Sequence, residues 1–190
     1  MTKYLIEKAE TFATEAHKGQ MRKCGKDIEY ITHPIGVAKI LQKINAPAEV
    51  VAAGFLHDVV EDTEYTLDDI GKHFGAMVKL IVEYVSEETV EPKPVWKVRK
   101  KAYIKKLEKA PIQAIIVAAA DKLYNLRETL QDYHEHGDDV WKIFNAQKES
   151  LYWYYTELLK IFKKRDVPQE MVTEIATAIK ILHFDKDVVV

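Results

Sequence analysis

The chain has 190 residues, of which 47% are hydrophobic and 31% are charged, and its formal net charge is −2. This composition is typical of a globular protein rather than a disordered one, and the near-neutral charge gives no general attraction to nucleic acid or to an anionic membrane. A single cysteine excludes an intramolecular disulfide, no secretory signal opens the sequence, and no apolar run approaches the ~20 residues of a membrane span, so we expect a cytoplasmic protein.

Apolar residues recur at helical spacing along almost the whole chain, and the alternation typical of strands is nearly absent. Thr66 and Asp69 resemble a capping box before one short helix. In chain order, we predict helices over residues 3–18, 34–44, 47–63, 66–74, 76–85, 95–109, 111–130, 139–163 and 168–183, with loops at 19–32 and 86–94 and a turn at 134–138. The sequence therefore predicts one all-α domain over residues 1–190, a bundle of about eight to ten helices.

The most informative segment is His57-Asp58, which is followed within four residues by Glu61-Asp62. If residues 47–62 form one continuous helix, His57 and Glu61 lie one turn apart on one face, as do Asp58 and Asp62. Imidazole nitrogens and carboxylate oxygens bind divalent metals, and carboxylates also transfer protons. The segment therefore predicts a site that hydrolyses a phosphate ester.

Two further residues can complete a metal site with His57 and Asp58. His33 stands at a helix start, and Asp121 interrupts the apolar run 115–120, where an unpaired buried carboxylate would be costly. We predict that these four side chains bind one divalent metal; the alternative for Asp121 is an ion pair with a lysine or arginine. The other histidines are predicted to be surface or capping residues: His17, His73, His134, His136 and His183.

This order of residues resembles the HD-domain metal-dependent phosphohydrolases, and in particular the hydrolase domain of RelA/SpoT proteins and the stand-alone small alarmone hydrolases. The resemblance covers about residues 4–130, and the remaining helices fit its all-α fold. Four segments carry it: AHKGQMRK at 16–23, YITHP at 30–34, HDVVEDT at 57–63 and ADKLYNLR at 120–127.

The resemblance implies an enzyme that removes pyrophosphate from the 3′ position of ppGpp and pppGpp, with Mn²⁺ as the metal. It implies that Glu61 and Asp62 form the catalytic pair, and it does not say which of them is the base. Cys24 and Glu29 depart from the family pattern beside the expected base pocket, which leaves guanine versus adenine open. The nucleotide contacts that it implies or suggests are Arg22, Lys23, Tyr124, Asn125 and Arg127.

Two other classes of function stay open at this point. The first is another HD-domain phosphatase, which would act on NADPH, a deoxynucleoside monophosphate or an adenosine alarmone. The second is a catalytically silent nucleotide sensor, which is disfavoured because all four ligands and both acids are present.

Two segments have mainly structural interpretations. Residues 93–109 hold eight lysines and arginines, which indicate a solvated helix face first, an electrostatic funnel for an anionic nucleotide second, and a nucleic-acid site last. Residues 141–162 are rich in large aromatic rings, which favours core packing with Trp153 and Tyr154 partly outside; a homodimer patch there is a further possibility.

Overall fold

The computed structural model describes residues 2–22, 27–88, 90–144 and 146–184. These residues form α-helices and one 3₁₀ helix, and their only β-pairing is an isolated bridge between Met21 and Glu29. The predicted all-α fold is therefore confirmed. The elements are α1 (Thr2–Ala16), α2 (Thr32–Lys43), α3 (Ala48–Leu56), α4 (Val59–Asp62), α5 (Leu67–Phe74), α6 (Ala76–Val85), α7 (Trp96–Glu108), α8 (Ile112–His136), η1 (Gly137–Ile143), α9 (Lys148–Lys164) and α10 (Gln169–Phe184).

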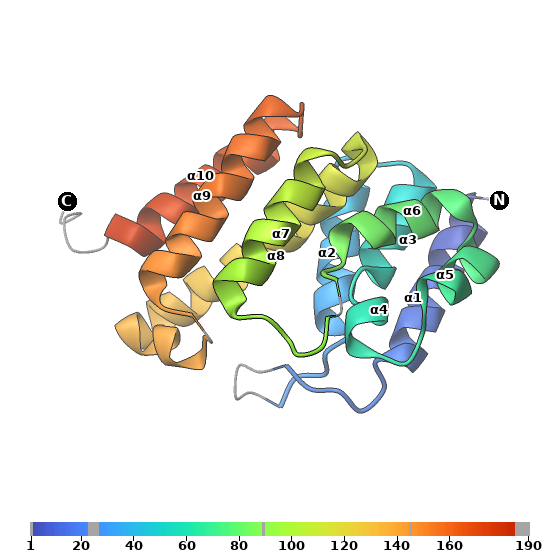
Figure 1. Ribbon diagram of the computed structural model, residues 1–190, viewed down its shortest axis with the longest axis horizontal. Coiled ribbons are helices and arrows are strands. Elements are labelled where there is room, and N and C mark those ends of the chain that lie inside the picture. Colours follow the sequence, from blue (N-terminus) through green and yellow to red (C-terminus); the bar gives the residue numbers. More distant parts are fainter. Residues whose placement is uncertain (1, 23–26, 89, 145, 185–190) are drawn as a thin grey trace.

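The long helix α8 runs through the middle of the molecule, between α1 at one end and α10 at the other (Figure 1). It contacts α2, α3 and α6 on the N-terminal side and α9 and α10 on the C-terminal side. Helix α3 packs against α1, α2, α6 and α8, and eight of its nine residues are buried. A helix that is apolar all round, as α3 is, belongs inside such a bundle. The α3–α8 contact therefore brings the end of α3 close to the middle of α8.

The capping box that the sequence predicts before α5 is present. Thr66 Oγ1 accepts a hydrogen bond from the Asp69 amide at 3.2 Å, and Asp69 Oδ2 accepts one from the Thr66 amide at 2.9 Å. Gly75 separates α5 from α6 at φ 90°, a conformation that favours glycine because it has no Cβ.

The prediction of one continuous helix over 47–63 is wrong, because the chain turns at His57 and Asp58 between α3 and α4. The His57 ring is the local cause. Its Nδ1 lies 2.9 Å from the Gly54 carbonyl oxygen, which in a continuous helix would accept from the amide of Asp58. The metal-binding motif therefore lies at a helix break, where two adjacent side chains can point toward the same place.

The C-terminal third differs from its prediction in two places. The turn expected at 134–138 is helical as far as His136, and Gly137 at φ 57° ends α8. The helix expected over 139–163 is divided into η1 and α9. Two burial predictions were also wrong: His17 is 2% exposed and Tyr154 is 4% exposed.

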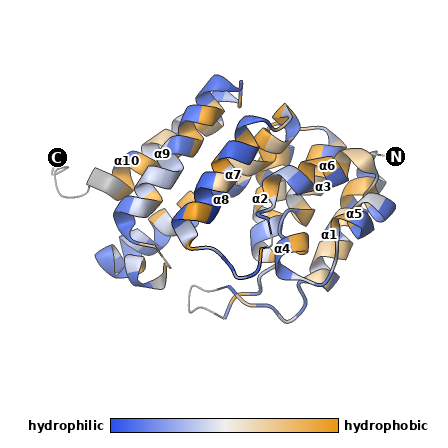
Figure 2. Ribbon diagram, in the orientation of Figure 1, coloured by the Kyte–Doolittle hydropathy of each residue, from blue (hydrophilic) through white to orange (hydrophobic). Residues whose placement is uncertain are grey.

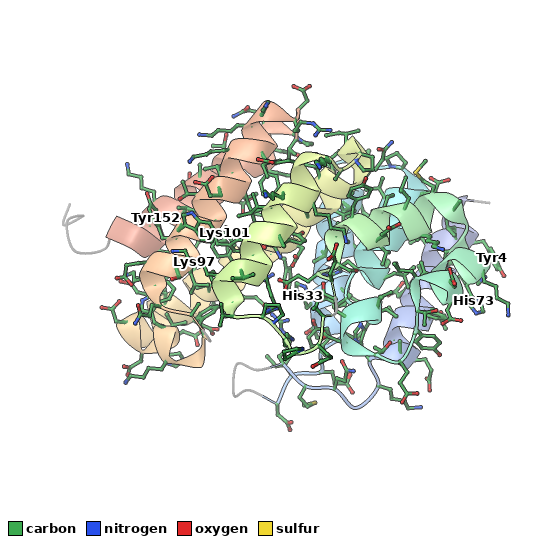
Figure 3. The ribbon with its side chains drawn as sticks, in the orientation of Figure 1. Tyr4, His33, His73, Lys97, Lys101 and Tyr152 are labelled. Carbon is green, nitrogen blue, oxygen red and sulfur yellow. The ribbon has the colours of Figure 1, made fainter. Side chains whose placement is uncertain are left out.

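Figure 2 contrasts the hydrophobic α6 with the hydrophilic α7. Lys97 and Lys101 project from the outer face of α7 (Figure 3), whereas Arg99 and Lys100 bind Glu87 on its inner side. The prediction of a solvated helix face therefore holds for only some of the basic residues of α7. In the described part of the chain, no helix has the length and apolarity needed to span a membrane.

Candidate metal centre and active site

Three helical segments bring the four predicted metal ligands together. His33 comes from the first turn of α2, His57 and Asp58 from the break between α3 and α4, and Asp121 from the middle of α8. His33 lies in the interior of the molecule (Figure 3), and both histidines are at most 3% exposed.

The carboxylates of Asp58 and Asp121 both lie close to the two histidine nitrogens. His33 Nε2 and His57 Nε2 are 3.1 Å apart, and Asp58 Oδ2 lies 3.4 Å from the first and 3.2 Å from the second. Asp121 Oδ1 lies 3.3 Å from His33 Nε2 and 3.8 Å from His57 Nε2. The ligand atoms of His33, His57 and Asp58 are close enough together to hold one divalent cation, and Asp121 Oδ1 faces the two histidine nitrogens beside this group.

The protonation of the site supports the same interpretation. Because Nδ1 of His57 faces the Gly54 carbonyl at 2.9 Å, it carries the hydrogen and leaves the Nε2 lone pair for a ligand bond. Burial lowers the pKa of His57, but the charge and hydrogen bond of Asp58 outweigh it and raise this pKa to about 9. His57 Nε2, which faces His33, Asp58 and Asp121, is the nitrogen left available to a metal.

Asp121 is held from two sides. Burial raises its pKa, yet the charge of Lys122 and the histidines keep it well below the usual range. Lys122 Nζ binds Oδ2 at 2.5 Å, and Asn125 Nδ2 donates to Oδ1 at 2.6 Å. Lys122 lies over the rings of Tyr103 and Tyr154, 5.7 and 6.0 Å from their centroids. Asp121 therefore combines both predictions made for it, an ion pair through one oxygen and a metal-facing position through the other.

Tyr30 connects the metal centre to the acidic pair. Its hydroxyl lies 2.6 Å from Asp58 Oδ2 and 3.1 Å from Asp62 Oδ2, and the backbone oxygen of Asp62 accepts from Gln20 Nε2 at 2.8 Å. Burial, with the charges of the two aspartates, raises the pKa of Tyr30 far above its usual value, so the hydroxyl remains a donor.

Glu61 lies at the solvent-exposed rim of the site, where Oε1 accepts the backbone N–H of Glu87 at 2.8 Å. Protein surrounds the carboxyl closely enough that partial desolvation, followed by the negative charge of Asp58, raises its pKa to about 7. A carboxyl group with such a pKa is able to exchange protons at neutral pH.

The structure brings some of the candidate nucleotide contacts to the metal centre and leaves others away from it. Arg22 pairs with Glu128 and lies 5.6 Å from the Tyr30 ring centroid, and the ring of Tyr124 is 5.2 Å from that of His33. Asn125 reaches the centre through Asp121. Arg127 instead binds Glu174 of α10 at 2.5 and 2.7 Å and is not brought to this centre. Lys23, like Cys24, lies outside the described residues.

Sequence reasoning missed four residues around the site: Tyr30, Glu87, Lys100 and Lys122. Tyr30 and Lys122 lie inside segments that carry the family resemblance, and that was the available signal. A second group of potential metal ligands lies near the end of α8 and consists of Asp132, Glu135 and His136. The side chains of Glu135 and His136 are exposed. This group differs from the first site in lacking buried histidines.

The comparisons with known proteins agree with this geometry. A family model described as "HD domain" matches residues 9–151. The human guanosine-3′,5′-bis(diphosphate) 3′-pyrophosphohydrolase MESH1 is 41% identical over 138 residues, which are 70% of this chain and 75% of that protein. A bacterial protein of the same enzyme name, from Haemophilus influenzae, is 36% identical over 121 residues, covering 60% of this chain and 17% of its own length.

Two solved structures share the fold. One, described as a metazoan ortholog of SpoT that hydrolyzes ppGpp, has a TM-score of 0.74 at 21% identity and covers 97% of both chains. The other, lmo0812 from Listeria monocytogenes EGD-e, has a TM-score of 0.69 at 30% identity and covers 78% of this chain and 96% of that one. The matched region 9–151 includes the histidines, the aspartates and the acidic pair, and this chain belongs to the HD-domain family.

Proposed function

We propose that this protein is a metal-dependent hydrolase that removes pyrophosphate from the 3′ position of guanosine 3′,5′-bis(diphosphate) and of its 5′-triphosphate counterpart. The observation that carries the proposal is the cluster of His33, His57 and Asp58, with Asp121 facing the two histidine nitrogens, next to an acid whose pKa is about 7. The names of the human and bacterial relatives support this choice of substrate.

Four nitrogen and oxygen ligands without a thiolate suit Mn²⁺, which we propose as the metal, although zinc or iron accept the same donors. When bound, such an ion lowers the pKa of a water molecule and neutralises negative charge on the phosphoryl oxygens. His57 is prepared for this role by its bond to the Gly54 carbonyl, and Asp121 by its bonds to Lys122 and Asn125.

We assign the role of general base to Glu61. It lies at the rim, where water has access, and burial with the nearby charge of Asp58 raises its pKa to about 7, toward the range that suits a general base. Glu61 would take a proton from the attacking water as the water oxygen bonds to the phosphorus next to the ribose 3′ oxygen. The bond between that phosphorus and the 3′ oxygen then breaks, the 3′ oxygen gains a proton, and pyrophosphate leaves.

Asp62 has a supporting role in this scheme. The Tyr30 hydroxyl lies within hydrogen-bond distance of both Asp58 and Asp62, so the two carboxylates share one donor. Asp62 is thereby held beside the centre, where it can orient the water or assist the leaving 3′ oxygen.

Arg22 and Tyr124 lie on the side of the centre where we place the nucleotide. Lys23, the next residue in the sequence, stays a prediction. A guanidinium group can stack on a base or bind phosphate through two donors. The Arg22–Glu128 ion pair would then have to open when substrate binds. Arg127 retains a structural partner in Glu174, so we do not assign it to the nucleotide. A single hydrolase domain, a cytoplasmic location and a homodimer remain predictions from the sequence.

One experiment tests the substrate. Protein stripped of metal and then supplied with Mn²⁺ is incubated with ppGpp, pppGpp, ppApp, NADPH and a deoxynucleoside monophosphate, and the released phosphate species is identified. We expect pyrophosphate from ppGpp and pppGpp, and none from a His57→Ala variant. Orthophosphate from NADPH or the monophosphate alone would favour a different HD-domain phosphatase, and no turnover at all would favour a nucleotide sensor.

A further inference from the structure

We infer that Glu87 is a positioning residue for Glu61, an inference that rests on the role proposed for Glu61 above. Glu87 follows the end of α6, whereas Glu61 lies in α4. The two meet through one hydrogen bond, in which the Glu87 backbone N–H donates to Glu61 Oε1 at 2.8 Å. This bond sets the direction of a side chain that is otherwise exposed at the rim of the site.

The Glu87 backbone is itself held in place by helix α7. Its carboxylate binds Arg99 through Oε2 and Lys100 through Oε1, and all three side chains are 12 to 23% exposed. Removing one partner from ion pairs that are largely shielded from water is costly, because it leaves the other charges unpaired. The carboxylate of Glu87 therefore orders the peptide whose N–H reaches Glu61.

Ser86 adds a second connection at the same point. Its backbone oxygen accepts from Lys106 of α7 at 3.0 Å, and its hydroxyl lies 2.8 Å from the Val82 oxygen and 3.4 Å from the His57 oxygen. Residues 86 and 87 therefore contact α7 on one side and the segment that carries His57 and Glu61 on the other.

The backbone N–H of Glu87 opposes the other influences on the charge of Glu61. Desolvation and the charge of Asp58 both disfavour the ionised carboxylate of Glu61, whereas the N–H of Glu87 stabilises it and lowers its pKa. The negative charge of Glu87 acts in the opposite sense, but it is compensated by Lys100 and Arg99. Glu87 thus offers Glu61 a donor while its own carboxylate is neutralised from the other side.

A purely structural role would be to attach α7 to the rest of the bundle. The two roles differ in one respect: a positioning residue acts on turnover only through Glu61. Substitution of Glu87 should then lower kcat strongly when Glu61 is present and have little further effect when Glu61 is already disabled. A general weakening of the fold would lower activity in both backgrounds.

The experiment is a double-mutant cycle with Glu61→Gln, Glu87→Ala and the double variant, all loaded with Mn²⁺ and assayed with ppGpp. We expect Glu87→Ala to lower kcat by roughly 10- to 100-fold, a part of the 10²–10⁴ typical of a general base, with KM changed less than threefold. The double variant should have the kcat of Glu61→Gln within about a factor of two. Asp68→Ala, which removes an ion pair between α5 and α6, is the matched control and should keep the wild-type kcat.

Equal losses from Glu87→Ala in both backgrounds would overturn the inference while the hydrolase function stands. A wild-type kcat in Glu61→Gln would overturn the role of Glu61 and the inference together, and no turnover by the wild type would overturn the proposed function with both. If Glu87→Ala does not fold, Glu87→Gln replaces it in the cycle, because its amide oxygen can accept from only one of the two cations and its neutral side chain removes the ion pairs while keeping the volume.

Discussion

The Tyr30 hydroxyl donates a hydrogen bond to Asp58, one of the four proposed metal ligands, with an oxygen–oxygen distance of 2.6 Å. The same hydroxyl lies 3.1 Å from Asp62, a member of the acidic pair. One donor is thus shared between the carboxylate that would face the metal and the carboxylate that would face the substrate.

Tyr30→Phe should weaken metal binding and turnover without unfolding the protein. Groups that hydrogen-bond a metal ligand typically account for about 10- to 100-fold in metal affinity or activity, so we expect a loss in that range. Mn²⁺ titration calorimetry and kcat at saturating Mn²⁺ measure the two effects separately. Tyr4→Phe is the control, because Tyr4 is 70% exposed on α1 and distant from the site in Figure 3. Unchanged metal affinity and kcat in Tyr30→Phe would contradict the shared-donor role.

The activity should depend on pH through Glu61. Its pKa of about 7 means that the base is protonated and inactive at lower pH, so kcat/KM should fall as pH decreases, by about tenfold per unit well below the pKa. A bound cation moves this acidic limb of the pH–rate profile to lower pH, because positive charge favours the ionised carboxylate of Glu61. Glu61→Gln should remove the limb; Glu64→Gln, on a neighbouring exposed acid, should retain it.

The same raised pKa has a consequence for stability. Glu61 binds its proton more tightly in the native state, since the pKa rises from 4.5 to about 7. Its contribution to stability is therefore fully present below about pH 4.5 and is lost as the pH rises through 7. The difference in the free energy of unfolding between wild type and Glu61→Gln should shift in favour of the variant over this range, as urea denaturation of the metal-free proteins can measure.

Metal binding should stabilise the fold at the buried site. Mn²⁺ at 100 times its Kd raises the free energy of unfolding by about 2.7 kcal/mol, which corresponds to a Tm increase of roughly 5–10 °C in a chain of this size. His57→Ala and Asp121→Asn should lose this increase. Glu135→Gln, in the other acidic group, should keep it. A shift abolished by Glu135→Gln and retained in His57→Ala would place the metal at the end of α8 instead.

Gly36 should prove necessary for the position of Tyr124. A Cβ at residue 36 would lie 1.9 Å from Tyr124 Cε2, so Gly36→Ala forces the ring away from its place beside His33. We expect KM to rise about tenfold, and overpacking to cost about 1–3 kcal/mol of stability. Gly71→Ala is the control, because its Cβ would meet only the flexible Lys79 side chain. In a Tyr124→Ala background, Gly36→Ala should have almost no further effect; a full additional loss there would show that the glycine acts elsewhere.

The local features of the chain were readable from the sequence because they depend on near neighbours. Helical periodicity predicted α1, α2, α5, α6 and α7, and the Thr66–Asp69 capping box formed as expected. Asp121 stood out because it breaks an apolar run, and the structure places it at the centre. The failures differ in origin. The His57 ring occupies the Gly54 carbonyl where the predicted helix is broken. The buried positions of His17 and Tyr154 come instead from contacts with distant segments.

The sequence by itself determined the all-α class, because helical periodicity depends on near neighbours, and its family resemblance pointed to four candidate ligands and a candidate acidic pair. Only the tertiary structure decided which groups surround them. Tyr30 beside Asp58, Glu87 beside Glu61, and the pairing of Arg127 with Glu174 each join segments far apart in the chain. Such contacts depend on how the segments around α4 pack and on how α8 packs against α10. A buried ion pair and a solvated surface charge look the same in a sequence until that packing removes the water.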